Sequence, residues 1–264
     1  MSDFIEDCLE RVLALQVRLY SCRARLIDCT DAEALHDLRV ALRQLRSLLR
    51  PLRGLPAVDA LEQGAAVLGR LSGPLRDREV LGAELERLGL AHLAPTADEQ
   101  RAAGYAAIAH SRELADLLLL LDGWPSSWRE AARQGQLRDV EKRIRRRLRR
   151  QQRRLARALR EPEHDRHRLR LLIKRVRYAA EAYPRQSRLP KAAQQRLKRA
   201  QGALGDWHDH VQWLAQAEAL SALRPCRAAW LQAQQAAERR ADDALLALYG
   251  DFPSEDKATF SPPI

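Results

Sequence analysis

Apolar residues recur at three- and four-residue steps along nearly the whole chain, which is the spacing of one face of an α-helix. The first such series is Phe4, Cys8, Val12, Leu15 and Leu19. Glycine and proline residues interrupt the pattern at intervals, as they do where helices end. The chain is therefore predicted to form eight helices in two sets of four. Their predicted positions are a helix from about residue 4, then 34–52, 57–90, 98–122, 137–160, 165–183, 190–220 and 224–249.

Three of the predicted helix boundaries rest on particular residues. Asp31 is expected to cap the second helix, because its short side chain can accept a hydrogen bond from a backbone N–H of the first turn. The pair Gly73-Pro74 is expected to kink the helix over 57–90. The segment Gly123-Trp124-Pro125 is expected to end the helix over 98–122.

The second half of the chain repeats a segment of the first without a gap. The segment His36-Asp-Leu-Arg39-Val-Ala-Leu-Arg43-Gln-Leu-Arg46 aligns with His167-Arg-Leu-Arg170-Leu-Leu-Ile-Lys174-Arg-Val-Arg177. Further on, Leu71-Ser-Gly73-Pro-Leu75-Arg-Asp77 aligns with Ala200-Gln-Gly202-Ala-Leu204-Gly-Asp206 after a two-residue shift. Matching apolar positions follow from any two amphipathic helices, but matching cations on a fixed face do not.

This repeat predicts an all-α fold of two four-helix bundles related by an approximate two-fold axis. The predicted boundaries are repeat 1 over about 1–128 and repeat 2 over about 134–250, within a single domain of residues 1–250. Residues 251–264, which contain three prolines, are expected to form a loose C-terminal tail.

The charge balance of the 264 residues changes this picture by suggesting a partner. Lysine and arginine together number 46 against 35 aspartates and glutamates, for a net charge of +11. A partner with negative charge is therefore expected. Only five of the cations are lysines, which is consistent both with phosphate recognition by arginine and with a GC-rich genome.

The cations of each repeated segment fall on one face of its predicted helix. At about 100° per residue, those of the first segment lie within an arc of about 80°, beside a separate apolar stripe. Like charges at this spacing repel one another, so either an anionic ligand or acidic residues of a neighbouring helix, such as Asp77 and Asp206, must offset them. The two cationic stripes are His36, Arg39, Arg43, Arg46 and Arg50, and His167, Arg170, Lys174 and Arg177, the latter followed by the hydrogen-bonding Tyr178.

The repeated His-x-x-Arg-x-x-x-Arg-x-x-Arg pattern, with a Leu-x-Asp motif on the next helix, resembles the CHAD domain (conserved histidine α-helical domain). The resemblance extends to about Gly250. It implies two four-helix bundles around a basic central cavity or groove. It also implies binding of inorganic polyphosphate at cytoplasmic polyphosphate granules, without catalysis. No cofactor and no metal-ligating residues are expected, and whether a divalent metal accompanies the ligand is left open.

Carried over residue by residue, the resemblance places both stripes in the polyphosphate site. Asp77 and Asp206 would orient the cations rather than touch the ligand. Four further arginines are expected to extend the site, namely Arg18, Arg76, Arg149 and Arg153. The second copy departs from the first, because Arg76 has no counterpart there and Arg50 corresponds to Glu181. We therefore expect a lopsided site.

Three other functions remain open on the sequence. A nucleic-acid binder would also use these cations, but only Tyr178 and Trp207 are available near them for stacking on bases. An enzyme is disfavoured, because no phosphate-binding glycine loop and no nucleophile elbow is present. His208 and His210 are metal-ligand types, yet the paired Glu-x-x-His motifs of a di-iron bundle are missing, so structural roles are expected for them. A helical scaffold for a partner protein is the third alternative.

The cysteines and the N-terminus predict a soluble cytoplasmic protein. No two of the four cysteines show Cys-x-x-Cys spacing, which favours free thiols in a reducing compartment. The acidic start of the chain lacks the pattern of a signal peptide. The longest aliphatic run, Leu117 to Leu121, is too short to cross a bilayer, so no membrane association is expected.

Overall fold

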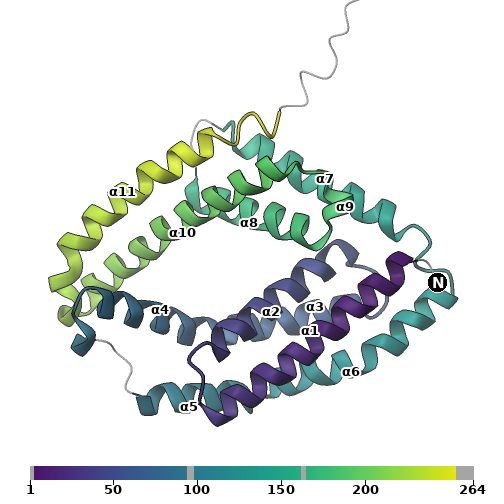
Figure 1. Ribbon diagram of the computed structural model, residues 1–264, viewed down its shortest axis with the longest axis horizontal. Coiled ribbons are helices and arrows are strands. Elements are labelled where there is room, and N and C mark those ends of the chain that lie inside the picture. The colour runs from purple at the N-terminus through teal and green to yellow at the C-terminus, as the bar shows by residue number, and fades with distance from the viewer. Residues whose placement is uncertain (1–2, 94–97, 162–164, 254–264) are drawn as a thin grey trace, which may run out of the picture. The chain divides into compact units, whose positions relative to one another are not determined.

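The computed structural model describes residues 3–93, 98–161 and 165–253, and these residues form helices and connecting turns without a strand (Figure 1). The all-α prediction is therefore confirmed. The chain divides into two compact units, Met1–Ile144 (unit 1) and Arg145–Ile264 (unit 2). The predicted domain bounds and the two-fold relation between repeats stay predictions, and most of the predicted tail lies outside the described residues.

In the part of the chain that the structure describes, unit 1 begins with six α-helices and two short 3-10 helices. Its α-helices are α1 (Asp3–Asp28), α2 (Ala34–Leu49), α3 (Val58–Leu71), α4 (Gly73–Arg87), α5 (Asp98–Ala109) and α6 (Arg112–Arg133), with short 3-10 helices η1 (Arg50–Leu52) and η2 (Ala91–Leu93). Leu38, Leu42, Leu45 and Leu49 of α2 are buried, as the predicted stripe requires. Helices α1 and α3 both contact α2, and α6 contacts α1 and α3.

Unit 2 has a core to which four of its helices contribute. Its elements are α7 (Val140–Ala158), which begins before the boundary, α8 (Arg166–Ala182), α9 (Pro184–Ser187), α10 (Lys191–Ala219), η3 (Ser221–Cys226) and α11 (Arg227–Leu246). The core includes Leu155 and Leu159 of α7, Ile173 of α8, Leu204 of α10 and Leu245 of α11. Asp165 caps α8 by accepting a hydrogen bond from the backbone N–H of Arg168.

The predicted end of the fourth helix at Pro125 is wrong, because Pro125 lies inside α6. Two buried tryptophans continue the helix past the proline. The rings of Trp124 and Trp128 stack with centroids 4.9 Å apart, and Nε1 of Trp128 donates a hydrogen bond to the backbone oxygen of Ile5 at 3.2 Å. The chain breaks earlier instead, where Oγ of Ser111 caps α6.

Two further boundaries differ from the predictions. Asp31 is not the N-cap of α2, a position held by Glu33, although an oxygen of Asp31 accepts the Glu33 backbone N–H at 2.8 Å. The segment 57–90 forms two helices that meet at the buried Ser72, rather than one kinked helix. The prediction of eight helices is accordingly wrong, since the described residues contain eleven α-helices.

Trp128 anchors α6 to α1 through burial and its hydrogen bond, so truncating it should be costly. We predict that Trp128→Ala lowers the free energy of unfolding by about 3–5 kcal/mol, as expected for a buried aromatic side chain. Trp128→Phe, which keeps most of the volume but loses the donor, should cost less. Urea unfolding followed by circular dichroism measures both, and equal losses for the two variants would contradict the packing role.

Candidate functional site

The first cationic stripe lies along α2 beside the junction between α3 and α4. Arg39 is half-buried there, and its Nη1 donates hydrogen bonds to the carbonyl oxygen of Gly69 at 2.9 Å and to Oγ of Ser72 at 3.1 Å. The helix break at Ser72 explains this contact, because the last carbonyl oxygens of a helix lack partners within it. The break therefore fixes the position of one cation of the stripe.

The surroundings of Arg39 contain charges of both signs. Burial lowers the pKa of Arg39, Asp77 acts against this change, and Arg76 and Arg43 add to it. The guanidinium group nevertheless stays protonated, since the ordinary pKa of arginine lies far above physiological pH. The structure thus brings four of the sequence-predicted residues, Arg39, Arg43, Arg76 and Asp77, close enough to act on one another electrostatically near the α3–α4 junction, and Asp77 lies where it can influence a cation. His36, Arg46 and Arg50 are half-buried members of the same stripe, and Arg43 is exposed.

A buried carboxylate that the sequence pattern did not single out holds the other end of this stripe. Glu62 of α3 is almost fully buried, and its side chain is 3% exposed. Its oxygens accept from Nε of Arg46 at 3.3 Å, Nε of Arg50 at 3.2 Å and Nη2 of Arg53 at 2.5 Å. Burial disfavours the ionised form of Glu62, but these three guanidinium groups outweigh it and lower its pKa. One negative charge is therefore shared by three positive charges.

A sequence signal for Glu62 exists in the apolar pattern of α3. Val58, Leu61, Ala65 and Leu68 are buried members of the core-facing side of that helix. Glu62 follows Val58 by four residues and precedes Ala65 by three, so it occupies the same side. A carboxylate at an apolar position requires a cationic partner, and the nearest predicted cations were those of α2.

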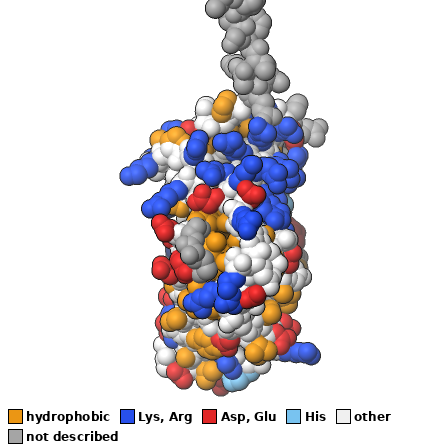
Figure 2. All heavy atoms as spheres, turned by 90° about the vertical axis from the view of Figure 1, so that its right-hand side faces the viewer, with side chains coloured by type: hydrophobic (Ala, Val, Ile, Leu, Met, Phe, Trp, Pro, Cys, Tyr) orange, Lys and Arg blue, Asp and Glu red, His pale blue; other side chains and the backbone are white. Residues whose placement is uncertain are grey.

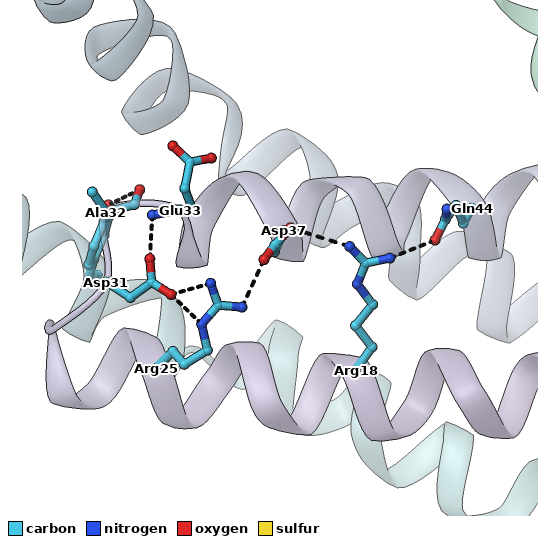
Figure 3. A network of polar contacts seen from close by, with 8 residues as sticks. Arg18, Arg25, Asp31, Ala32, Glu33, Asp37 and Gln44 are labelled. Carbon is cyan, nitrogen blue, oxygen red and sulfur yellow. Dashed lines mark hydrogen bonds and ion pairs between the residues drawn. The ribbon is translucent and has the colours of Figure 1, made fainter.

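Arg18 belongs to a different network, on another face of α2 (Figure 3). Its guanidinium nitrogens lie 3.3 Å from Oδ1 of Asp37 and 3.3 Å from Oε1 of Gln44. Arg25 completes the network by bridging Asp31 and Asp37, with Nη1 at 2.8 Å from Oδ2 of Asp37. Asp37 is about 140° around the helix from the centre of the stripe. The structure therefore does not bring Arg18 together with the stripe.

In unit 2, the guanidinium group of Arg177 donates hydrogen bonds both to a neutral amide and to a carboxylate. Its Nε donates to Oε1 of Gln201 on α10 at 2.7 Å, and its Nη1 donates to Oε1 of Glu181 at 2.5 Å. Its guanidinium carbon lies 4.3 Å from the ring centroid of Tyr178, whose hydroxyl accepts from Nε2 of Gln201 at 3.1 Å. The residue that corresponds to Arg50 thus provides the carboxylate here. Residues 191–193, which correspond to Glu62, include no acid.

His208 of α10 lies against the second stripe, where we had expected a structural residue. Its ring centroid is 5.4 Å from that of His167. Burial lowers the pKa of His208 to about 4, and the charges of Arg170, His167 and Lys174 on α8 contribute to the shift. His208 is therefore a neutral base among cations near neutral pH. The structure places these four residues together at the contact between α8 and α10.

The register of the repeat could have pointed to His208. With the two-residue shift that aligns Leu75 with Leu204, His208 corresponds to Glu79. Glu79 accepts from Nη1 of Arg76 at 2.9 Å and from the hydroxyl of Tyr105 at 2.6 Å. Glu79 also acts electrostatically on Arg39, as Arg170 does on His208, and Arg39 aligns with Arg170. The two units therefore hold a carboxylate and a neutral histidine at matching positions near this matching pair of arginines.

Asp206 does not contact its own stripe through any hydrogen bond or ion pair between described residues. Its Oδ2 lies 3.5 Å from Nη2 of Arg240 on α11, and both side chains are exposed. The geometry around Asp206 thus differs from that around Asp77. The location of Asp77 near Arg39 supports its predicted role in orienting the cations of the stripe, whereas the location of Asp206 beside Arg240 does not support that role.

Both units therefore carry a helix with a histidine and three cations on one side, beside a helix that supplies their partners. The family model of the CHAD domain matches residues 11–218. This chain belongs to the CHAD domain family. The same family was indicated by the repeated histidine-arginine segment.

The fold of this CHAD domain resembles that of a solved relative. The crystal structure of the CHAD domain from the plant Ricinus communis matches with a TM-score of 0.58 and 24% sequence identity, covering 96% of this chain and 86% of that one. At this identity the match establishes the fold alone. No curated protein matches the chain.

The remaining predicted residues of the CHAD domain lie on α7. Arg149 and Arg153 are exposed there. The described residues contain no cluster of three or more His, Cys, Asp or Glu side chains that could hold a metal ion. Every helix in the described part of the chain is too short or too polar to span a bilayer.

Removing the charge of Glu62 should expose the repulsion that it offsets. We predict that Glu62→Gln lowers the free energy of unfolding by about 1–3 kcal/mol, the usual cost of leaving buried polar groups without a strong partner. Added sulfate or phosphate should restore part of this loss, because an anion can take the place of the carboxylate. Thermal unfolding with and without each salt, with Glu84→Gln as a control on α4, measures the effect. No salt-dependent difference between the two variants would contradict it.

The lowered pKa of His208 predicts a pH dependence of stability. Between about pH 4 and 6.5 the unfolded chain binds a proton at this residue that the folded chain does not. The free energy of unfolding should therefore fall as the pH falls through this range, and His208→Gln should remove that part of the fall. Urea unfolding at pH 7 and pH 5 tests this, and an unchanged difference between the two pH values in the variant would refute it.

Proposed function

We propose that this CHAD domain binds inorganic polyphosphate and does not catalyse a reaction on it. The observation that carries the proposal is the sharing of buried Glu62 by Arg46, Arg50 and Arg53, which leaves an excess of positive charge in a fixed place. The family is associated with polyphosphate binding. A ligand that brings many negative charges would offset the repulsion that the protein leaves uncompensated.

The chemistry of the stripes suits a polymer of phosphates. Arginine presents planar N–H donors that match phosphate oxygens, and each charge-assisted contact releases counterions from the polyanion. The stripes repeat their cations at about one helical turn, so a chain can bind several of them in succession. Recognition of this kind requires no contact with a base or a sugar.

We propose that the domain is not a catalyst because the arginines of both stripes stay protonated. Guanidinium groups remain charged at all physiological pH values, so they serve as fixed charges and donors, not as general bases. His208, which lies beside the second stripe, has a pKa that is lowered to about 4. Binding of a polyanion would offset the neighbouring cations and favour a proton on His208. We place the protein in the cytoplasm, at polyphosphate granules.

RNA binding is the second candidate, supported by the aromatic rings beside the second stripe. Tyr178 and Trp207 are both partly exposed. The guanidinium of Arg177 already lies over the ring of Tyr178, however, at 4.3 Å from its centroid. A base would have to displace that cation in order to stack on the same face. Polyphosphate needs no such rearrangement, and we therefore favour it.

Neutralising the stripes should weaken binding while leaving the fold intact. We predict that Arg39→Gln, Arg43→Gln, Arg170→Gln and Lys174→Gln together weaken binding of long-chain polyphosphate at least tenfold. The slope of log affinity against log salt should also become less steep, by about one for each phosphate that the variant no longer binds. Titrations across a salt series, with circular dichroism to check folding, provide the measurement.

A control variant removes three cations that are exposed on α6, through Arg112→Gln, Arg129→Gln and Arg133→Gln. These changes should leave affinity within about twofold, because they lie off the stripes. Competition with single-stranded RNA of equal charge separates the two candidate functions. Equal or tighter binding of RNA would overturn the proposal, as would undiminished polyphosphate binding by the folded stripe variant.

A further inference from the structure

Helix α7 carries a second concentration of cations, which the α8–α10 site does not use. Six arginines of this helix are exposed, and together we call them the outer arginine face. They are Arg146, Arg149, Arg150, Arg153, Arg154 and Arg157. All six lie in unit 2, beyond the boundary after Ile144. Figure 2 shows Lys and Arg side chains gathered on the part of unit 2 that its view presents.

The outer arginine face points away from the core of unit 2. At about 100° per residue its members cover an arc of about 140°, and the centre of that arc is about 180° from the buried stripe of the same helix. That stripe includes Leu148, Leu155 and Leu159, of which the last two belong to the core shared with α8, α10 and α11. The outer arginine face is therefore a different surface from the stripe of α8.

Nothing acidic interrupts this surface along its helix. The only acidic residue of α7 is Glu141, more than a turn before Arg146. Among the described residues, Arg146, Arg149, Arg150 and Arg154 form no ion pair or hydrogen bond through their side chains. Four like charges within three turns repel one another, which costs stability unless an anion offsets them.

Helix α6 shows what an ordinary solvated face looks like in the same chain. There the exposed Arg112 lies 3.4 Å from Asp116, and the exposed Arg133 lies 2.5 Å from Glu130. Both pairs are neutral overall and both follow the spacing of neighbours on a helix surface. A GC-rich genome would enrich arginine on both helices, but it would not remove acidic residues from one of them. The contrast favours a role for the outer arginine face in binding.

The side chains present on α7 narrow the chemistry of the partner. From Arg146 to Arg157 the axis rises about 16 Å, or one guanidinium group for about every 3 Å. Helix α7 includes no aromatic residue on which a base could stack, and its outer face has no apolar residue that could enter a bilayer. A bare, densely charged polyanion fits this surface best.

We propose that the outer arginine face is a second polyphosphate-binding surface, separate from the stripe on α8. The inference rests on the proposed function for the choice of ligand, and on the opposed faces of α7 for the separation of the two surfaces. It moves Arg149 and Arg153 from the predicted groove to this surface. One molecule can then hold two polyphosphate chains, or two distant segments of one chain.

Two separate surfaces have a consequence that one surface lacks. A protein that holds two chains links them, and many such links assemble chains into a network whose strength exceeds that of each contact. The stripes of α2 and α8, when they bind one chain in succession, would coat that chain without linking it to another. Clustering of long chains is therefore the property that distinguishes the inference from the proposed function.

The experiment compares three proteins in titrations with short polyphosphate of about ten phosphates. The face variant carries Arg146→Gln, Arg150→Gln and Arg154→Gln, which keep good helix formers at exposed positions. The stripe variant is the quadruple change at residues 39, 43, 170 and 174, and the third protein combines both sets. The triple glutamine variant of α6 is the control for the loss of three positive charges.

The inference predicts that the stripe variant retains weak binding, which the combined variant loses at least tenfold. The face variant should bind about one short chain fewer than the unaltered protein, and it should no longer cluster long chains in light scattering. The α6 control should behave as the unaltered protein does. Circular dichroism must show that all variants are folded.

The possible failures are distinguishable. If the unaltered protein does not bind polyphosphate, the proposed function fails. If the face variant binds and clusters as the unaltered protein does, while the stripe variant has lost all binding, the proposed function stands and the inference is overturned. Loss of RNA binding alone in the face variant would also overturn it, since the surface would then serve a different polyanion.

Discussion

Arginine side chains that lie half-buried beside an apolar seam impose the constraint on which both units depend. A carboxylate or an imidazole can give up its charge when it is buried, but a guanidinium group cannot at any physiological pH. Each such arginine must therefore meet acceptors or an opposite charge. The helix break at Ser72 supplies a backbone carbonyl oxygen and a hydroxyl for Arg39, and Glu62 supplies a carboxylate for three other arginines.

The two units meet this constraint with different partners although the cations keep their spacing. In unit 1 the charge comes from a neighbouring helix, through Glu62. In unit 2 it comes from Glu181 on the cationic helix itself, and an amide of Gln201 completes the set of acceptors. Where unit 1 has Glu79, unit 2 has His208, which is neutral at pH 7 and able to take a proton. The second stripe is thus the one whose charge can respond to what binds beside it.

The sequence was sufficient for the helical class, the family and the two cationic stripes, because each depends on spacing along one helix. It was insufficient where several helices meet. Proline usually ends a helix, but α6 continues past Pro125. The stacking of Trp124 on Trp128 and the hydrogen bond from Trp128 to Ile5 of α1 explain why. Arg18 has the same chemistry as Arg39, but it reaches α2 from α1 on the face that carries Asp37, away from the stripe. The partners of long arginine side chains cannot be assigned from one helix alone.

The sharing of Glu62 by three arginines also bears on how this domain responds to selection for heat resistance. Any single replacement of Arg46, Arg50 or Arg53 by a neutral residue would leave the carboxylate better matched to the cations that remain. Screens for more stable variants would therefore select replacements at those positions, and each gain would remove a cation from the stripe or, at Arg53, from beside it. Stability and ligand binding are therefore opposed around Glu62, which is the trade-off expected at a functional surface.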